Sequence, residues 1–305
     1  MIEPLINTKV KPLDLQALAY ITFLGFLYGT TLVVSRFSVG QFEPTTYIGL
    51  RLLMSSLGYI AIYVLRIKDR RWPKNPRLWG HAAVLGVFGS ALPMTAFVSS
   101  LLYQSSGVTS VLITASPAIT VLMAHFTLSD ERLTLRKSVG VVLALGGALL
   151  LVIRGESGLP DMGQASPIGY LLVLIGMLSS GAMRIYIRKY MREFSSFNVG
   201  AVRMFAASFT VIPLSLLTVG LDFSRTNTQG WLALLYAALF GTFIAMLFDF
   251  YNTKRFGATA SVMVAYVVPV VAGIVGALFL DERITAGMLA GMILISLGVW
   301  LINRK

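Results

Sequence analysis

Two short sequences decide the fold of this chain: DERLT at residues 130–134 and DERIT at residues 281–285. Each precedes an apolar stretch, and the two boxes are 151 positions apart. The apolar stretches share a pair of glycines spaced by seven residues at the same offset: Gly140 and Gly147, then Gly291 and Gly298. A recurrence of this kind indicates that one half of the chain repeats the other.

Further matches occur at an offset of 152. They pair Arg36 with Arg188, Arg51 with Arg203, and Pro117 with Pro269. Because the matches keep the same order along both halves, we interpret them as one duplicated unit. The predicted repeats are residues 1–153 and residues 154–305.

The composition places both repeats in a membrane. The chain is 56% hydrophobic and 12% charged, against about 25% charged in soluble domains. It has no cysteine, which excludes a disulfide-stapled secreted fold. Ten stretches are long and apolar enough to span a bilayer: 15–35, 44–65, 78–103, 107–128, 138–153, 168–187, 197–219, 231–253, 257–280 and 284–302. They lack the alternation of barrel strands, so the prediction is an all-α integral membrane protein.

Five spans in each repeat is an odd number, so the second copy must enter the membrane upside down. Inverted repeats are a transporter architecture, in which the substrate site lies near the midplane between the copies. Two near-equivalent packings of one unit can then expose that site to either compartment. A channel or a membrane enzyme does not require this symmetry, and both remain alternatives from a different class.

The basic residues predict the orientation. The formal net charge is +12, which by itself also fits nucleic-acid binding. With ten spans, however, 18 Lys and Arg fall on the side that holds both termini and 4 on the other side. This asymmetry predicts a multi-pass protein of the cell (cytoplasmic) membrane with both termini in the cytoplasm, and contact with anionic lipid rather than nucleic acid. Trp79, Trp231 and Trp300 fall near predicted helix ends, as interfacial anchors do, and Trp72 lies in the basic loop nearby.

The chain resembles the drug/metabolite transporter superfamily, and within it the EamA-domain family. The resemblance rests on the Asp-Glu-Arg box that opens the fifth span of each half, on Arg51 and Arg203 early in the second span of each half, and on the ten spans. It covers nearly the whole chain as two EamA repeats. It implies a central cavity lined by spans 1–4 and 6–9, with spans 5 and 10 at the periphery, and export of amino acids or other small metabolites.

Four ionisable residues inside the spans are the first candidates for the substrate site: Arg51, Arg184, Arg203 and Asp249. In one interpretation Asp249 pairs with Arg184 or Arg203, and the other arginines reach the interface. In the other, arginines face the cavity and attract a carboxylate, since three cations against one anion favour zwitterions or anions. Four tyrosines on predicted cavity helices are further candidates: Tyr28, Tyr103, Tyr186 and Tyr266.

The prolines and glycines carry separate predictions. Pro117 and Pro269 occupy equivalent positions and are candidates for hinges or gates, because proline removes a backbone donor. The four repeated glycines are interpreted as a packing face, and the pair Gly287–Gly291 as a candidate dimer face. The Asp-Glu-Arg boxes are expected to start helices, with Thr134 and Thr285 as N-caps.

The sequence thus predicts a secondary transporter that exports amino acids or other small polar metabolites by alternating access. Its partners are a small-molecule substrate and the lipid bilayer, and it is a monomer or weak homodimer. No catalytic residue, metal or cofactor is expected. The alternatives are proton-coupled efflux of cationic drugs and a nucleotide or nucleoside-type carrier. The small multidrug transporters of the superfamily use a glutamate in the first span, and residues 15–35 contain no acidic residue.

Overall fold

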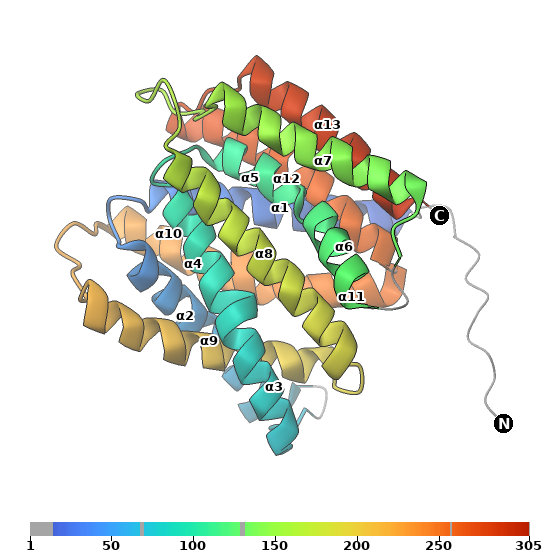
Figure 1. Cartoon of the computed structure of the whole chain (residues 1–305). Helices are drawn as coiled ribbons and strands as arrows, with labels where there is room; N and C mark the ends of the chain where they lie inside the picture. The colour runs from blue at the N-terminus through green and yellow to red at the C-terminus, as the bar shows by residue number, and fades with distance from the viewer. Residues whose placement is uncertain (1–14, 68–69, 129–131, 257, 305) are drawn as a thin grey trace.

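The computed structural model describes residues 15–67, 70–128, 132–256 and 258–304 (Figure 1). In the first half the helical elements are α1 (Leu15–Phe37), α2 (Pro44–Val64), α3 (Pro76–Gly86), η2 (Val87–Ala91), α4 (Leu92–Ser100), α5 (Ser106–Thr114), α6 (Ser116–Thr127) and α7 (Leu135–Arg154). In the second half they are α8 (Pro167–Tyr190), α9 (Ser196–Thr218), α10 (Thr228–Ala238), η3 (Leu239–Ile244), α11 (Ala245–Phe256), α12 (Ala258–Leu280) and α13 (Ala286–Asn303).

Within the described ranges, ten helices are long and apolar enough to cross a membrane. This confirms the predicted fold class, and the helix ends agree with the expected spans to within a few residues. Three spans are interrupted. The third consists of α3, the π-helical segment η2 and α4; the fourth breaks between α5 and α6; and the eighth consists of α10, the π-helical segment η3 and α11.

Equivalent helices of the two halves pack antiparallel, which is the geometry of an inverted repeat. Figure 1 shows α7 and α13, the fifth span of each half, side by side along one edge of the bundle. A methyl group on Gly140 would lie 2.6 Å from the Gly298 carbonyl oxygen, and one on Gly147 would lie 2.9 Å from the Gly291 carbonyl oxygen. The four repeated glycines therefore form the predicted packing face, where no side chain fits between the backbones.

This contact also corrects the prediction of a dimer face. Gly291 packs against Gly147 and Leu151 of α7, and Gly287 lies against Arg154 and Glu156. The Gly287–Gly291 pair is therefore covered by the same chain. The sequence pattern marks a close helix contact correctly, but it carries no information about which helix makes that contact.

The second span of each half repeats the antiparallel arrangement. At one end of the α2–α9 pair, the hydroxyl oxygens of Thr46 and Ser215 are 2.6 Å apart. At the other end, Tyr63 Oη donates to Asn198 Oδ1 at 2.9 Å. Residue numbers rise along α2 as they fall along α9, so these equivalent helices point in opposite directions.

The fifth span of each half begins as predicted. The Thr134 hydroxyl accepts from the Lys137 amide at 3.4 Å, and the Thr285 hydroxyl accepts from the Met288 amide at 3.0 Å. Glu282, in contrast, caps a different helix. Its carboxylate accepts from the Ser106 amide at 2.8 Å, the Ser106 hydroxyl at 2.7 Å and the Gly107 amide at 3.3 Å, and so ties the second half to the N-terminus of α5. The first half's counterpart, Glu131, lies outside the described residues.

Candidate functional site

A cavity of about 380 Å³ lies among helices of both halves, lined by residues of α1, α2, α4, α5, α6, α8, α11 and α12. None of its lining residues belongs to α7 or α13. Its charged and phenolic lining groups are Tyr28, Arg51, Arg184 and Asp249. The hydroxyls of Thr31, Ser35, Ser110, Thr114 and Ser116 add polar surface, and aliphatic and aromatic side chains complete the wall.

The structure therefore brings four of the eight predicted site residues to one cavity and places the other four elsewhere. Tyr103 lies in the turn after α4, packed against Gly169 at the start of α8. Tyr186 binds α3, with its hydroxyl 2.7 Å from Nδ1 of His81. Tyr266 packs, half-buried, beside the core formed by α5 to α8 and α13. The roles of all eight in transport stay predictions.

Arg203, the repeat counterpart of Arg51, does not line the cavity, but the two arginines make matched contacts across the repeats. Arg51 Nε donates to Thr242 Oγ1 at 2.7 Å, from the first half to the second. Arg203 Nε donates to Ser90 Oγ at 2.8 Å, from the second half to the first. Like the arginines, Ser90 and Thr242 are 152 positions apart. Each half of the chain therefore supplies the arginine of one of these bonds and the hydroxyl of the other.

Both hydroxyl acceptors lie in π-helical segments. Ser90 belongs to η2, which begins at Val87, and Thr242 belongs to η3, which begins at Leu239, again 152 positions later. Proline alone does not explain them, because the position equivalent to Pro93 is Ala245. π-Helical turns inside α-helices are frequent at functional sites. Sequence reasoning missed Ser90 and Thr242, although the offset that pairs the arginines also pairs these hydroxyls.

The two arginines differ in their surroundings. Arg51 is 7% exposed and lines the cavity, and its second hydrogen bond runs from an NH1 donor to Ser35 Oγ at 3.4 Å. Arg203 is half-buried. In the described part of the chain no carboxylate accepts a hydrogen bond from Arg51, so its charge faces the cavity with hydroxyl partners alone.

The charges of Arg184 and Asp249, which line the same cavity, interact with each other. This agrees with the interpretation in which Asp249 is partnered by an arginine. Two arginines and one aspartate leave the cavity with one excess positive charge. Among the described residues, no three His, Cys, Asp or Glu side chains come together as metal ligands would.

The two candidate hinge prolines also differ. Pro117 lines the cavity and follows the break at Ala115 that separates α5 from α6. Since proline has no amide hydrogen, the first turn of α6 loses no hydrogen bond at this position. Pro269 lies inside α12, which continues without a break. A hinge function for either residue stays a prediction.

Comparisons with known proteins agree with this architecture. The EamA-like transporter family matches the chain twice, over residues 15–153 and residues 167–304. An uncharacterized transporter of Archaeoglobus fulgidus is 22% identical, over 91% of this chain and 95% of its own length. The uncharacterized transporter YoaV of Bacillus subtilis is 24% identical, over 90% of this chain and 92% of its own length.

The uncharacterized inner membrane transporter YedA of Escherichia coli is 26% identical, over 92% of this chain and 91% of its own length. A protein of known crystal structure superposes with a TM-score of 0.63 over 93% of this chain and 95% of its own, at 20% identity, which shows a shared fold. The family and the names of these relatives indicate a transporter. With a family match in each half, and ten helices in its described ranges that are long and apolar enough to cross a membrane, this chain belongs to the EamA-like transporter family.

Proposed function

We propose that the chain is a secondary transporter that exports amino acids or similar small zwitterionic or anionic metabolites. The site is the central cavity, and the two inverted halves move around it to expose it to one side of the membrane and then the other. In this proposal both termini are cytoplasmic, because the basic residues concentrate on their side.

The observation that carries the substrate class is the buried charge of Arg51. A guanidinium held only by hydroxyls in a low-dielectric wall is poorly compensated. A substrate carboxylate placed in the cavity would supply the missing negative charge through charge-assisted hydrogen bonds. Arg184 and Asp249, which line the same cavity, offer a second recognition point, where Asp249 would meet an ammonium group.

The size and polarity of the cavity favour a small polar substrate. Its volume of about 380 Å³ is at the lower end of the range for ligand pockets. Hydroxyls from α1 and α5 alternate with apolar side chains such as Met94, Phe97 and Val98 of α4. This lining suits a molecule that has a charged backbone group and a modest apolar side chain.

A counterflow assay tests the proposal. Proteoliposomes containing the purified chain are loaded with one unlabelled compound, and entry of the same labelled compound is followed for amino acids, dicarboxylates, nucleosides and a cationic dye. We expect saturable exchange of one or more amino acids. Arg51→Gln should raise the half-saturating concentration about tenfold or more, since a charge-assisted hydrogen bond contributes about 1.5–3 kcal/mol.

Arg192→Gln is the matched control, because Arg192 is exposed and, among the described residues, its Nε donates to the Arg188 carbonyl. It should leave exchange unchanged. Preferential exchange of the cationic dye, driven by a proton gradient and abolished in Asp249→Asn, would instead establish proton-coupled cation efflux. The position of Asp249 in the cavity wall is the observation that favours that second candidate.

A further inference from the structure

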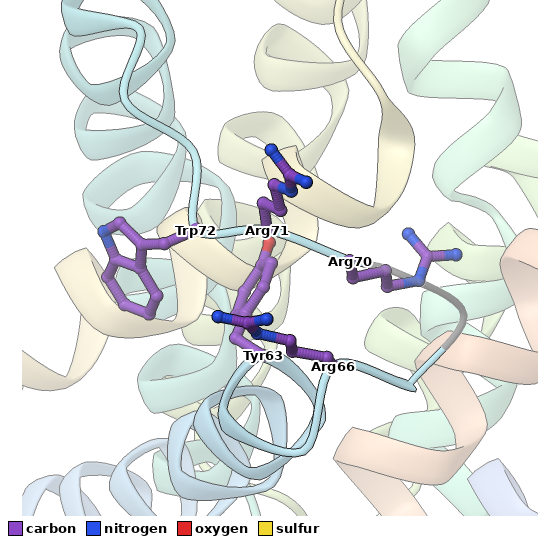
Figure 2. Close-up of a pocket in the computed structure, with 5 residues that line it drawn as sticks. All are labelled: Tyr63, Arg66, Arg70, Arg71 and Trp72. Carbon is purple, nitrogen blue, oxygen red and sulfur yellow. The ribbon is translucent and has the colours of Figure 1, made fainter.

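A second cavity, of about 460 Å³, lies where the chain leaves α2 and turns toward α3 (Figure 2). Its lining residues, among those the structure describes, are Tyr63, Arg66, Arg70, Arg71 and Trp72, which present three guanidinium groups and no carboxylate. It shares no lining residue with the central cavity. This cluster of positive charge is therefore separate from the substrate cavity, and it calls for a ligand of its own.

The three arginines are held in different ways. The guanidinium carbon of Arg70 lies 3.7 Å from the centre of the Phe197 ring, a cation–π contact that fixes this side chain on α9. The guanidinium groups of Arg66 and Arg71 have no hydrogen bond or ion pair with any residue that the structure describes. Figure 2 shows the Arg66 side chain turned toward Tyr63, with Arg71 on the returning loop beyond the phenol. Within the described part of the chain, the guanidinium groups of Arg66 and Arg71 thus remain available to a ligand.

Aromatic side chains place this cavity at the membrane interface. Trp72 contacts Tyr63, Trp79 and Phe205, with ring centres 5.2, 5.8 and 5.4 Å apart. Trp and Tyr collect at the level of lipid headgroups, where one edge of the ring is wet and the other apolar. The same end of α2 carries the exposed apolar side chains Val64, Leu65 and Ile67. A ligand at this position meets cations at the headgroup level and apolar surface beside them.

We propose that this cavity binds the phosphate of an anionic phospholipid. Arginine presents paired donors that match phosphate oxygens. In a zwitterionic headgroup such as phosphatidylcholine, the ammonium group beside the phosphate would be repelled by the same arginines. A soluble phosphate uses the arginines alone, whereas a lipid also places its acyl chains against Val64, Leu65 and Ile67. The site therefore selects a phospholipid such as phosphatidylglycerol over free phosphate. It does not depend on the substrate that crosses the central cavity.

Native mass spectrometry of the full-length purified chain tests this proposal. Phosphatidylglycerol and phosphatidylcholine are titrated against the wild type, the double variant Arg66→Gln/Arg71→Gln and the control Arg192→Gln. We expect wild type and control to bind phosphatidylglycerol more tightly than phosphatidylcholine. The double variant should lose about tenfold to thirtyfold in affinity for phosphatidylglycerol, given the usual contribution of each interfacial arginine.

Inorganic phosphate and glycerol 3-phosphate form the second arm. If either displaces phosphatidylglycerol at equal concentration, the site recognises soluble phosphate and the lipid proposal is overturned. Equal lipid affinity in the double variant and the control would overturn it as well. The charge-preserving variant Arg66→Lys/Arg71→Lys guards against a folding artefact. It should retain a preference for phosphatidylglycerol, since the charges remain, but bind more weakly than wild type because it loses the paired donors.

Discussion

The matched arginine–hydroxyl bonds allow a prediction in which one half of the molecule serves as the control for the other. Arg51 and Thr242 are 7% and 5% exposed, and their hydrogen bond is 2.7 Å long. Thr242→Val keeps the shape of the side chain and removes the acceptor. A charge-assisted hydrogen bond in such a buried place contributes about 1.5–3 kcal/mol, and we expect the free energy of unfolding to fall by this amount.

A double-mutant cycle separates the bond from the other effects of each substitution. Thr242→Val, Arg51→Met and the double variant are unfolded reversibly in mixed detergent micelles. In the Arg51→Met background the charge is gone, so Thr242→Val should cost only the hydrogen bond that the Thr242 hydroxyl donates to the Ala237 carbonyl at 2.9 Å. The expected coupling free energy is about 1.5–3 kcal/mol. Thr242→Ser, which keeps the hydroxyl, should preserve most of it.

The equivalent cycle for Arg203 and Ser90 should give a smaller value, about 0.5–1 kcal/mol. The bond is nearly as short, at 2.8 Å, but Arg203 is only half-buried, whereas Arg51 is buried. Coupling near zero for Arg51–Thr242, or a larger coupling for Arg203–Ser90, would refute the argument that burial sets the strength of these bonds.

Three further predictions concern the scaffold and the orientation. Glu282→Gln should lower the free energy of unfolding by about 1.5–3 kcal/mol, because it weakens three hydrogen bonds at the start of α5. The control is Glu43→Gln, since Glu43 is an exposed glutamate before α2 that makes no side-chain cap. Equal losses of stability in the two variants would contradict the capping role of Glu282. Gly147→Ala should lower the free energy of unfolding by about 1–3 kcal/mol, because the added methyl group pushes α7 away from α13. Gly146→Ala, whose methyl group would meet open space, should leave the stability unchanged or raise it. If Gly146→Ala unfolds at a lower temperature than Gly147→Ala, the proposed contact is ruled out. Because the chain has no cysteine, the single-cysteine variants Ser224→Cys and Lys74→Cys report which side of the membrane each loop faces. A maleimide that cannot cross the membrane, added to intact cells, should label only Ser224→Cys. Labelling of Lys74→Cys alone would reverse the proposed orientation.

The ten spans and their inversion could be predicted because they depend on properties that sequence records directly. Hydropathy over about 20 residues marks each span, and the offset between DERLT and DERIT marks the duplication. The glycines of α7 and α13 could also be assigned to a packing face, since a spacing of seven residues returns to the same side of a helix. Their partner could not, because spacing does not say which helix lies opposite.

The interruptions within the spans could not be predicted in the same way. Pro117 accompanies a break between α5 and α6, while its counterpart Pro269 lies in the continuous helix α12. The π-helical segments occur with Pro93 in one half and without proline in the other. In each case, whether the helix is interrupted depends on the residues that pack against it. A single proline permits an interruption but does not decide it. Glu282 is a similar case, since its partners are 175 and 176 positions away.

The candidate site shows where the repeat stops being informative. Arg51 and Arg203 hold identical positions in the two halves and bond to equivalent hydroxyls, yet only Arg51 lines the cavity. A sequence repeat assigns the same role to both, because it encodes the contacts each unit can make. One packed arrangement of two inverted units need not place equivalent side chains at equal depth, so one member of a pair can be more buried than the other. The difference in burial between Arg51 and Arg203 therefore results from the way the two halves pack. The two double-mutant cycles report it as a difference in coupling free energy.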